Sequence, residues 1–328
     1  MQTIPSRRRA VLRALGAVAL GGVAPRGGAQ GAPWPNRPVR IVIPFAAGTS
    51  PDINARVIGA KLSELWGQPL VIENRTGAAG GIGTQAVASA APDGYTLLYV
   101  ISSVICANPH LYARLPYDTF RDLRPVVGTV VQGYVMTARK DGPFKTFDQF
   151  LAYARANPGK LNYSSSGVGS GNHLGMELLN GMAGIKTVHI PVTTEPSLAV
   201  MAGTVDVSLT PFTTALPSVK GDKLLALAVT TASRSAILPE VPAVAERLPG
   251  FLADGFHGIY VPVATPAPIV ERINADVRQV MALPELDKRF RDSALDPVPG
   301  SPAEFAQRVR AEYDKWGRVI RAANIQPQ

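Results

Sequence analysis

The chain of 328 residues contains a single cysteine, Cys106, so it cannot form a disulfide bond within itself. We expect this residue to be small buried packing rather than a thiol nucleophile. Charged residues make up only 17% of the sequence and hydrophobic residues 46%, which is typical of a folded globular chain and not of a disordered one. The length is sufficient for two domains with a core each.

Long hydrophobic runs are scarce. Beyond residue 31 no segment reaches eighteen consecutive apolar residues, so the sequence predicts no transmembrane helix there. Runs of Lys and Arg with interleaved aromatic residues are also missing from that part, which argues against a nucleic-acid partner. The histidines show no metal-ligand spacing. We therefore expect no nucleic acid, no metal site and no cofactor.

Residues 1–31 have the pattern of a secretory signal peptide. Arg7, Arg8 and Arg9 precede an apolar stretch at 14–24, which small residues follow. Two export routes fit, the twin-arginine route and a Sec route with an unusually basic start. We expect cleavage near residues 29–31. Because the segment contains five arginines and no acid, its removal lowers the formal net charge from +9 to +4.

Residues 39–100 alternate between strand and helix patterns. Near-continuous apolar runs at 39–45, 69–74 and 95–100 are typical of buried strands. Ser50 is expected to be the N-cap of the helix that follows the first run. This order predicts parallel strands with right-handed crossovers in an α/β domain. In such sheets, ligands bind beyond the carboxyl ends of the strands.

The second half of the chain repeats this alternation without repeating the sequence. We expect the chain to pass between two lobes near residues 125–134 and again near 251–260. The domain interpretation assigns 32–130 and 255–328 to a first lobe and 131–254 to a second.

Three loops share one chemical character, since each is small, polar or glycine-rich and precedes a helix pattern. They are 44–52 (PFAAGTSPD), 75–83 (RTGAAGGIG) and 164–171 (SSSGVGSG). Small side chains let a ligand approach the main chain, and N–H groups at a helix start carry partial positive charge. The loops therefore predict a site that holds carboxylate or phosphate without Arg or Lys. Asp52 has two readings: it complements the helix dipole, or it accepts hydrogen bonds from a ligand or its waters.

Other uses of these loops fit the sequence less well. The stretch 81–86 matches G-x-G-x-x-A, but it follows the second strand rather than the first and lacks a well-placed acid about twenty residues on. A P-loop is excluded because no Gly-Lys-Ser/Thr follows the glycines. The segment 167–171 misses the G-x-S-x-G spacing of a hydrolase elbow. Ser164–Ser170 with His173 nevertheless keep an exported serine hydrolase as an alternative.

Several stretches resemble one family, the substrate-binding proteins of tripartite tricarboxylate transporters, also called the Bug family. They are PVRIVIPFAAGTSPDINAR, QPLVIENRTGAAGGIGTQAVASAAPDGYTLL, YSSSGVGSGNHLGMEL, HIPV, AGTVDVSL, LLALAVTT and AEYDKWGRVIRAANI. The resemblance covers nearly all of the chain beyond the signal. It implies an α/β, two-lobed periplasmic binding protein of type II-like architecture, with the ligand cleft between the lobes. The implied function is to capture a small organic carboxylate by lobe closure, without turnover, and deliver it to a membrane transporter.

The resemblance also implies partners and a location. The partners are the large and small membrane subunits of a transporter, and the location is the periplasm. We expect a monomer. A ligand-sensing receptor that presents itself to a sensor kinase uses the same fold and pocket, so this alternative stays open.

Carried over residue by residue, the resemblance implies a ligand site built from main-chain groups, ordered waters and a few side chains. The implied residues are Phe45, Ala46, Ala47, Gly48, Thr49, Asp52, Gly77, Ala78, Ala79, Ser164, Ser165, Ser166, Gly167, Val192, Thr193 and Thr210.

This sequence departs from the family pattern at three places. This chain has PFAAGT where the family pattern has PFPPGG, and HIPVTT where the pattern has HVPYKG. It has Phe256-His257 where the pattern has a tryptophan-tyrosine pair. A site that depends on backbone should tolerate these changes. Because the usual lysine is replaced at Thr193, a monocarboxylate or an aromatic acid is favoured over a dicarboxylate.

Overall fold

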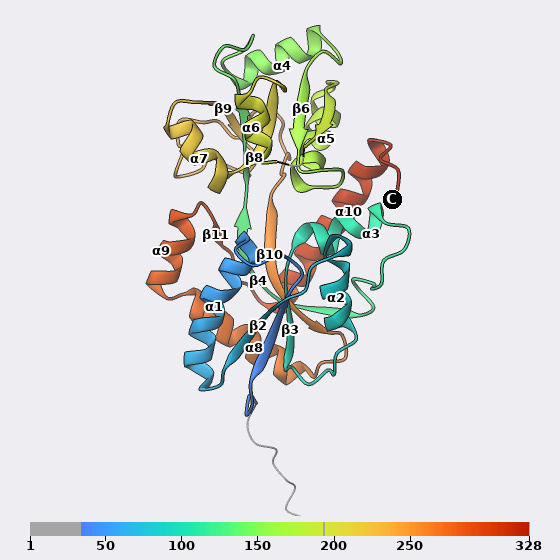
Figure 1. The fold of residues 1–328 in the computed structure, drawn as a ribbon, viewed down its shortest axis with the longest axis vertical. Coiled ribbons are helices and arrows are strands. Elements are labelled where there is room, and N and C mark those ends of the chain that lie inside the picture. Colours follow the sequence, from blue (N-terminus) through green and yellow to red (C-terminus); the bar gives the residue numbers. More distant parts are fainter. Residues whose placement is uncertain (1–33, 193, 328) are drawn as a thin grey trace, which may run out of the picture. The chain divides into compact units, whose positions relative to one another are not determined.

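The computed structural model describes residues 34–192 and 194–327, which build two mixed β-sheets, each with helices on its faces (Figure 1). The predicted signal peptide, residues 1–31, lies outside the described residues, and so does Thr193. The first sheet has the strand order β11-β4-β10-β3-β1-β2 and the second β7-β6-β8-β5-β9. The prediction of an α/β, two-lobed fold is confirmed.

The strands of the first sheet come from both ends of the described chain. They are β1 (Val39–Ile43), β2 (Leu70–Asn74), β3 (Thr96–Ile101), β4 (Leu123–Gln132), β10 (Gly255–Pro262) and β11 (Asp296–Pro297). As predicted, β1 pairs in parallel with β2 and with β3. The return strand β10 is antiparallel and lies between β3 and β4. The carboxyl ends of β1, β2 and β3 therefore share one edge with the amino end of β10.

The helices of this lobe cover both faces of its sheet. They are α1 (Ser50–Trp66), the short 3₁₀ turn η1 (Ala78–Gly80), α2 (Gly81–Ala88), the π-helical turn η2 (Ser103–Ala107), α3 (Asn108–Leu111), α8 (Ala267–Met281), α9 (Pro284–Asp292) and α10 (Pro302–Ala322). Alternate residues of β1 point to opposite faces. Ile41 packs with Ile58 of α1 and Ile273 of α8, whereas Val42 lies in the core that contains Val309 of α10.

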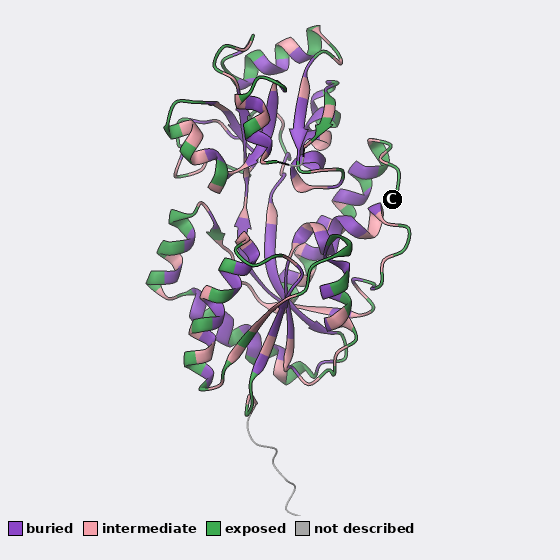
Figure 2. Cartoon of the chain, in the orientation of Figure 1, coloured by how far each residue is buried: buried purple, intermediate pink, exposed green. Residues whose placement is uncertain are grey.

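The second lobe is built from one continuous stretch of chain. Its strands are β5 (Tyr134–Ala138), β6 (Asn162–Ser165), β7 (Val188–Pro191), β8 (Val207–Pro211) and β9 (Leu225–Val229). Its helices are α4 (Phe147–Ala156), α5 (Gly171–Ala183), α6 (Pro196–Met201), α7 (Phe212–Lys220) and the 3₁₀ turn η3 (Val244–Glu246). The chain leaves the first sheet after Gln132 and re-enters it at Gly255. Figure 2 shows the strands of both lobes largely buried beneath their helices.

One sequence expectation about a helix start is wrong. Thr49, not Ser50, is the N-cap of α1, and the helix begins at Ser50. Neither hydroxyl acts as a side-chain cap; instead the Asp52 carboxylate accepts the N–H of Gly48 at 2.9 Å. An acid two residues inside the helix therefore organises the turn before it, which a local capping rule does not anticipate.

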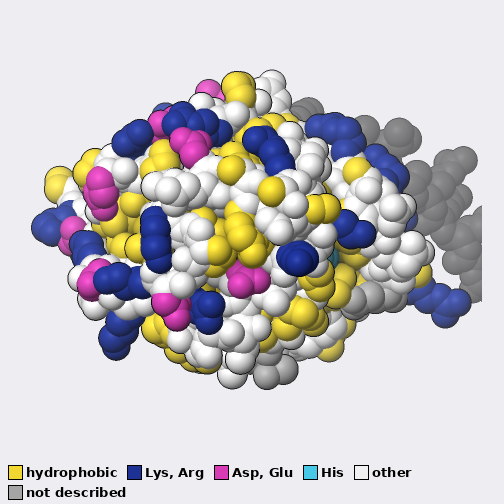
Figure 3. All heavy atoms as spheres, turned by 90° about the horizontal axis from the view of Figure 1, so that it is seen from above, with side chains coloured by type: hydrophobic (Ala, Val, Ile, Leu, Met, Phe, Trp, Pro, Cys, Tyr) yellow, Lys and Arg dark blue, Asp and Glu magenta, His cyan; other side chains and the backbone are white. Residues whose placement is uncertain are grey.

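On the face of the molecule that Figure 3 shows, Lys and Arg side chains are scattered among Asp, Glu and hydrophobic side chains. Within the described ranges, no helix is long and apolar enough to cross a membrane. In the same ranges, no group of three or more His, Cys, Asp or Glu is arranged to hold a metal ion. Cys106 is buried, as expected.

Candidate functional site

The first predicted loop connects β1 to α1 and exposes its small residues. Ala46, Ala47 and Gly48 are exposed, while Phe45 and Thr49 are half-buried. The turn closes on itself, because the Thr49 hydroxyl donates to the carbonyl oxygen of Ala46 at 2.7 Å. This places an accessible stretch of main chain directly before the amino end of a 17-residue helix, where partial positive charge gathers.

Asp52 is 2% exposed and fixes this loop from below. Its Oδ2 atom accepts hydrogen bonds from Gly48 N–H and from Nε of Arg56 at 3.0 Å, and its Oδ1 atom accepts one from Asn74 at 2.9 Å. The Arg56 hydrogen bond, together with those from Gly48 and Asn74, lowers the pKa of Asp52 to about 2. The carboxylate is therefore ionised at neutral pH, and its oxygens are used within the protein.

The second predicted loop follows β2 and has an unusual backbone. Gly77, Ala78, Ala79 and Gly80 are four consecutive residues with positive φ, of 116°, 47°, 50° and 90°. Alanine rarely occupies this left-handed region, which costs about 1–2 kcal/mol per residue. Backbone strain of this kind clusters at binding sites, where the surrounding structure maintains it. Gly77, Ala78 and Ala79 are exposed, so their main chain is accessible.

Asn74 joins the two loops. Its Nδ2 atom donates to the carbonyl oxygen of Phe45 at 3.0 Å and to Asp52 at 2.9 Å. Gly83 brings the loops together from the other side, since a Cβ there would lie 2.7 Å from the Arg75 carbonyl oxygen. The first two predicted loops therefore form one unit at the carboxyl edge of the first sheet.

The third predicted loop belongs to the second lobe and runs from the end of β6 to the start of α5. We call residues 165–170 the serine loop. Ser166 is exposed and Gly167 is half-buried with a φ of 121°. Asn172 braces the loop, because its side chain accepts the N–H of Ser166 and the hydroxyl of Ser170.

The short helix α3 relates the serine loop to the loops of the first lobe. Asn108 at its start donates its side-chain N–H to the carbonyl oxygen of Ala79 at 2.9 Å. Leu111 at its end lies so close to Gly169 that a Cβ on this glycine would be 2.3 Å from Leu111 Cδ1. One turn of helix thus contacts a predicted loop from each lobe, and all three predicted loops converge.

A cavity of about 160 Å³ lies between the lobes beside this point. Sequence reasoning missed most of its residues; the exceptions are Ser170 and Gly171 of the third predicted loop and the altered pair Phe256 and His257. The lining includes Ile101, Ser102, Ser103, Gln132, Tyr134, Ser170, Leu174, Asp254, Phe256, His257 and Trp316. Ser102 was available as a signal, because it follows β3 as the predicted loops follow β1 and β2. Neighbouring strands lie about 5 Å apart, so the end of β3 at Ser102 is about one strand spacing from the end of β1 and two from the end of β2.

His257 and Asp254 are the titratable residues of this lining whose contacts matter most. The Nδ1 atom of His257 lies 3.3 Å from Nδ2 of Asn54, and burial lowers the pKa of His257 to about 4, which makes it neutral at pH 7. Asp254 pairs with Arg308 of α10 at 3.1 Å. The cavity therefore combines hydroxyls, a neutral imidazole and aromatic rings with one paired carboxylate.

Some predicted site residues are not accessible. The side chains of Ser164 and Thr210 are fully buried: Ser164 donates to Pro196 O, and Thr210 joins the hydroxyls of Thr137 and Ser208. Ser165 is also fully buried. Val192 is half-buried and donates its N–H to Ser165 O at 2.9 Å. Ser164, Ser165 and Thr210 thus support the second-lobe wall from within in this conformation, whereas Val192 is partly accessible. A ligand contact at any of these four residues stays a prediction.

The serine and histidine side chains are not arranged as the hydrolase alternative requires. The histidine beside a serine is His189, whose Nε2 lies 2.5 Å from Ser165 Oγ, whereas His173 Nδ1 accepts the Gly169 N–H. Because Ser165 is fully buried, its hydroxyl is closed to an acyl substrate. The contact between His189 and Ser165 organises a loop, and the hydroxyl of the exposed Ser166 contacts Asn172 rather than a histidine.

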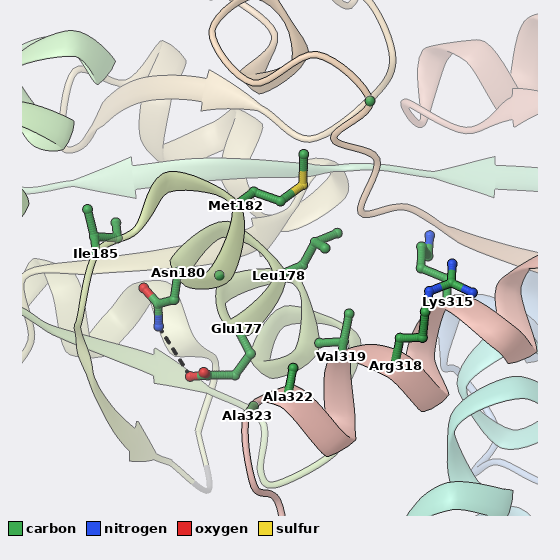
Figure 4. A pocket seen from close by; sticks show the side chains of 12 residues that line it. Glu177, Leu178, Asn180, Met182, Ile185, Lys315, Arg318, Val319, Ala322 and Ala323 are labelled. Carbon is green, nitrogen blue, oxygen red and sulfur yellow. Dashed lines mark hydrogen bonds between the residues drawn. The ribbon is translucent and has the colours of Figure 1, made fainter.

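A larger hollow of about 630 Å³ lies elsewhere, between α5 and α10 (Figure 4). Figure 4 shows Leu178 and Met182 on one side and Lys315, Arg318 and Val319 on the other. The hollow contains none of the predicted site residues. The candidate ligand site is therefore located by the converging loops and not by the size of the hollow.

The two sheets, the paired crossings and the loops at the sheet edge define a two-lobed α/β solute-binding protein. A family model described as the tripartite tricarboxylate transporter family receptor matches residues 54–325. The chain belongs to this family, so the resemblance seen in the sequence is confirmed.

Three comparisons place the chain within the family. It is 31% identical to BugT of Bordetella pertussis, covering 88% of this chain and 90% of BugT. It is similar to the structure of Rpa4515 of R. palustris with adipate, with a TM-score of 0.78 and 31% identity. The match covers 90% of this chain and 100% of Rpa4515. It is also similar to MatC (Rpa3494) from Rhodopseudomonas palustris with bound malate, with a TM-score of 0.73 and 31% identity. This match covers 88% of this chain and 100% of MatC.

Proposed function

We propose that this receptor captures a small organic carboxylate between its lobes and releases it unchanged to a membrane transporter. The observation that carries the proposal is the union of the two small-residue loops through Asn74 and Asp52, beside the cavity between the lobes. Accessible main chain at a helix start binds carboxylate well. The exposed residues 46–48 and 77–79 are alanine or glycine, so their side chains are too small to obstruct the ligand.

In this proposal the ligand carboxylate lies over residues 45–49 and 77–79, held by main-chain groups and ordered waters. The serine loop approaches from the second lobe. Asp52 acts mainly from beneath the loop, because its oxygens already accept three hydrogen bonds from protein groups. We therefore propose an indirect role for Asp52 in binding, in which its carboxylate holds the loop that the ligand contacts.

The other end of the ligand would occupy the cavity between the lobes. Its lining offers hydroxyls from Ser102 and Tyr134 and aromatic surface from Phe256 and Trp316. Such a lining suits an aromatic or monocarboxylic acid, in line with the loss of the lysine at Thr193. The relatives whose structures carry adipate and malate hold dicarboxylates, so both acid classes belong in the test.

Capture requires the lobes to close. We propose hinges at the two crossings, near Gly133 and near Asp254, which divide the chain into lobes 32–130 with 255–328, and 131–254. Ligand contacts in both lobes would favour the closed state. The fully buried Ser165 supports a receptor without turnover.

We further propose that residues 1–31 direct export and that the mature protein acts in the periplasm as a monomer. Its partners would be the large and small membrane subunits of a tripartite tricarboxylate-type transporter. Presentation of the liganded protein to a sensor kinase remains the alternative for what happens after capture.

The test is a thermal-shift screen of the mature protein against monocarboxylates, aromatic acids, dicarboxylates, tricarboxylates and amino acids. A ligand present at a hundred times its Kd adds about 2.7 kcal/mol of stability, which raises Tm visibly. We expect at least one acid to raise Tm and to be recovered unchanged after incubation. A panel without any stabilising acid, or a hit that is converted to product, would contradict the proposal.

A further inference from the structure

Two histidines of the second lobe stack against each other beneath the serine loop. The rings of His173 on α5 and His189 on β7 have centroids 4.0 Å apart and planes 22° apart. Tyr163 of β6 stacks on His189 at 5.1 Å. His173 is 4% exposed. Three aromatic rings from three elements thus form one stack beneath the serine loop, which the proposed function places against the ligand.

Each histidine is bonded to a different end of the serine loop. Nδ1 of His173 accepts the main-chain N–H of Gly169 at 3.0 Å. Nε2 of His189 lies 2.5 Å from the hydroxyl of Ser165, which also accepts the N–H of Gly167 at 3.1 Å. The pair therefore holds both ends of the serine loop.

The bond to Gly169 fixes the protonation state of His173. A main-chain N–H always donates, so Nδ1 must be the unprotonated acceptor, and any proton of the neutral ring lies on Nε2. A second proton would have to bind at Nδ1 and would remove the acceptor of Gly169. Two charged rings at a centroid distance of 4.0 Å would also repel each other.

Gly169 is also the point where the serine loop touches the first lobe, through Leu111. Loss of its hydrogen bond to His173 would therefore change both the shape of the loop and its contact across the lobes. We propose that His173 and His189, in their neutral forms, are positioning residues for ligand binding that hold the serine loop in its binding shape. This inference rests on the proposed function, because it assumes that the serine loop closes on the ligand.

The surroundings of the pair favour the neutral forms. Burial and the neighbouring His189 lower the pKa of His173 to about 4, and burial lowers the pKa of His189. The other titratable groups nearby are Tyr163 and Glu177, and Glu177 accepts the Tyr163 hydroxyl at 2.5 Å. Beyond Glu177, Lys315 and Arg318 of α10 line the hollow between the helices. The pair is therefore neutral at pH 7, and acid would release the loop.

The first experiment needs no ligand. In the ¹⁵N-labelled mature protein, imidazole and amide resonances are followed by NMR from pH 7.5 to pH 3.5. We expect the Gly169 amide resonance to move together with the His173 titration, well below pH 6.5. His110 of α3 is the control histidine, because its Nε2 contacts the carbonyl oxygen of Tyr313 and not the serine loop. A Gly169 amide that ignores the His173 titration would overturn the proposal.

The second experiment compares two variants at one position. In His173→Asn the side-chain oxygen occupies about the position of Nδ1 and can still accept the Gly169 N–H, whereas in His173→Leu nothing can. We expect Leu to weaken binding at pH 7 about tenfold or more, and Asn to stay within about threefold of the original chain. Equal losses in both variants would overturn the positioning role. Binding is measured by calorimetry with adipate and with the acid that raises Tm most in the screen.

The pH profile of Kd separates positioning from simple packing. With a pKa of His173 near 4, the original chain should lose about fourfold more affinity than the Asn variant at pH 3.5, because only the original chain gains a proton at position 173. Protonation of the ligand affects both proteins equally and cancels. If no acid binds at all while Gly169 follows His173, the proposed function fails and the coupling of histidine to loop stands.

Discussion

The side-chain amide of Asn74 and the carboxylate of Asp52 meet at 2.9 Å and fasten the end of β2 to the first turn of α1. The same Asn74 nitrogen donates to the carbonyl oxygen of Phe45 at 3.0 Å. Two loops that are thirty residues apart in sequence thus become one surface. Because this surface is made of main chain, its shape depends on a few buried polar side chains and on glycines that allow close approach.

The substitution Asp52→Asn tests that linkage. All three partners of the carboxylate are donors, so an amide would point its own N–H₂ group at one of them. We expect the free energy of unfolding to fall by about 1–3 kcal/mol and ligand affinity to fall about tenfold. Urea denaturation and calorimetry measure the two effects. Asp93→Asn is the matched control: its ion pair with Arg37 is exposed, and its loss should change stability by under about 1 kcal/mol.

Asp52 also predicts an acid-sensitive contribution to stability. Its pKa falls from 3.8 to about 2 on folding, so the unfolded chain takes up the proton first. The stabilisation is present above pH 3.8 and is lost as the pH falls towards 2. The Asp52→Asn variant should therefore differ most from the original chain above pH 4 and converge with it near pH 2. Denaturation curves at pH 6, 4 and 2.5 check this, and a constant difference would contradict it.

Ala78 provides a second test, because its φ of 47° leaves little room for a branched side chain. We expect Ala78→Val to destabilise the protein by about 2 kcal/mol or more and to weaken ligand binding. Ala60→Val, at an exposed position of α1, should cost only about 0.5 kcal/mol through helix propensity. Equal effects on the two Tm values would mean that the second loop relaxes without strain.

Gly83 is expected to be sensitive to a single methyl group. A Cβ there would lie 2.7 Å from the Arg75 carbonyl oxygen and 3.0 Å from Cα of Pro44, and both are backbone atoms that cannot rotate away. We expect Gly83→Ala to cost about 1–3 kcal/mol and to separate the two loops, which lowers affinity. In Gly181→Ala on α5 the added Cβ meets no atom within 4 Å, so it should be neutral or stabilise by up to about 1 kcal/mol. Chemical denaturation of both variants decides.

Ligand preference is tested at position 193, where the family pattern has lysine and this chain has threonine. We expect Thr193→Lys to strengthen binding of adipate by about tenfold, since one new charge pair contributes about 1.4 kcal/mol. Binding of benzoate, which has a single carboxylate, should change little. Calorimetry with both acids gives the ratio. An unchanged ratio would show that the second carboxylate of adipate is recognised elsewhere.

Much of the fold follows from the sequence alone. The apolar runs near residues 39, 70 and 96 predict the parallel strands β1, β2 and β3, because a near-continuous hydrophobic strand must be buried on both faces. The small residues of all three loops are also visible in the sequence, since local composition determines which segments leave the main chain accessible.

Other features depend on contacts between residues far apart in the sequence, and only the tertiary structure decided them. Insertion of β10 between β3 and β4 brings Asp254, Phe256 and His257 to the edge where the loops lie, and no periodicity reveals a partner more than a hundred residues away. The same holds for Asp52: the sequence left its role open because the donor that ties it to the second loop, Asn74, arrives from β2. It holds again for Thr210, which composition could not distinguish from an exposed threonine and which packing buries completely. Local chemistry thus determined the strands and the accessible loops, and only long-range packing determined which polar groups support the site from within.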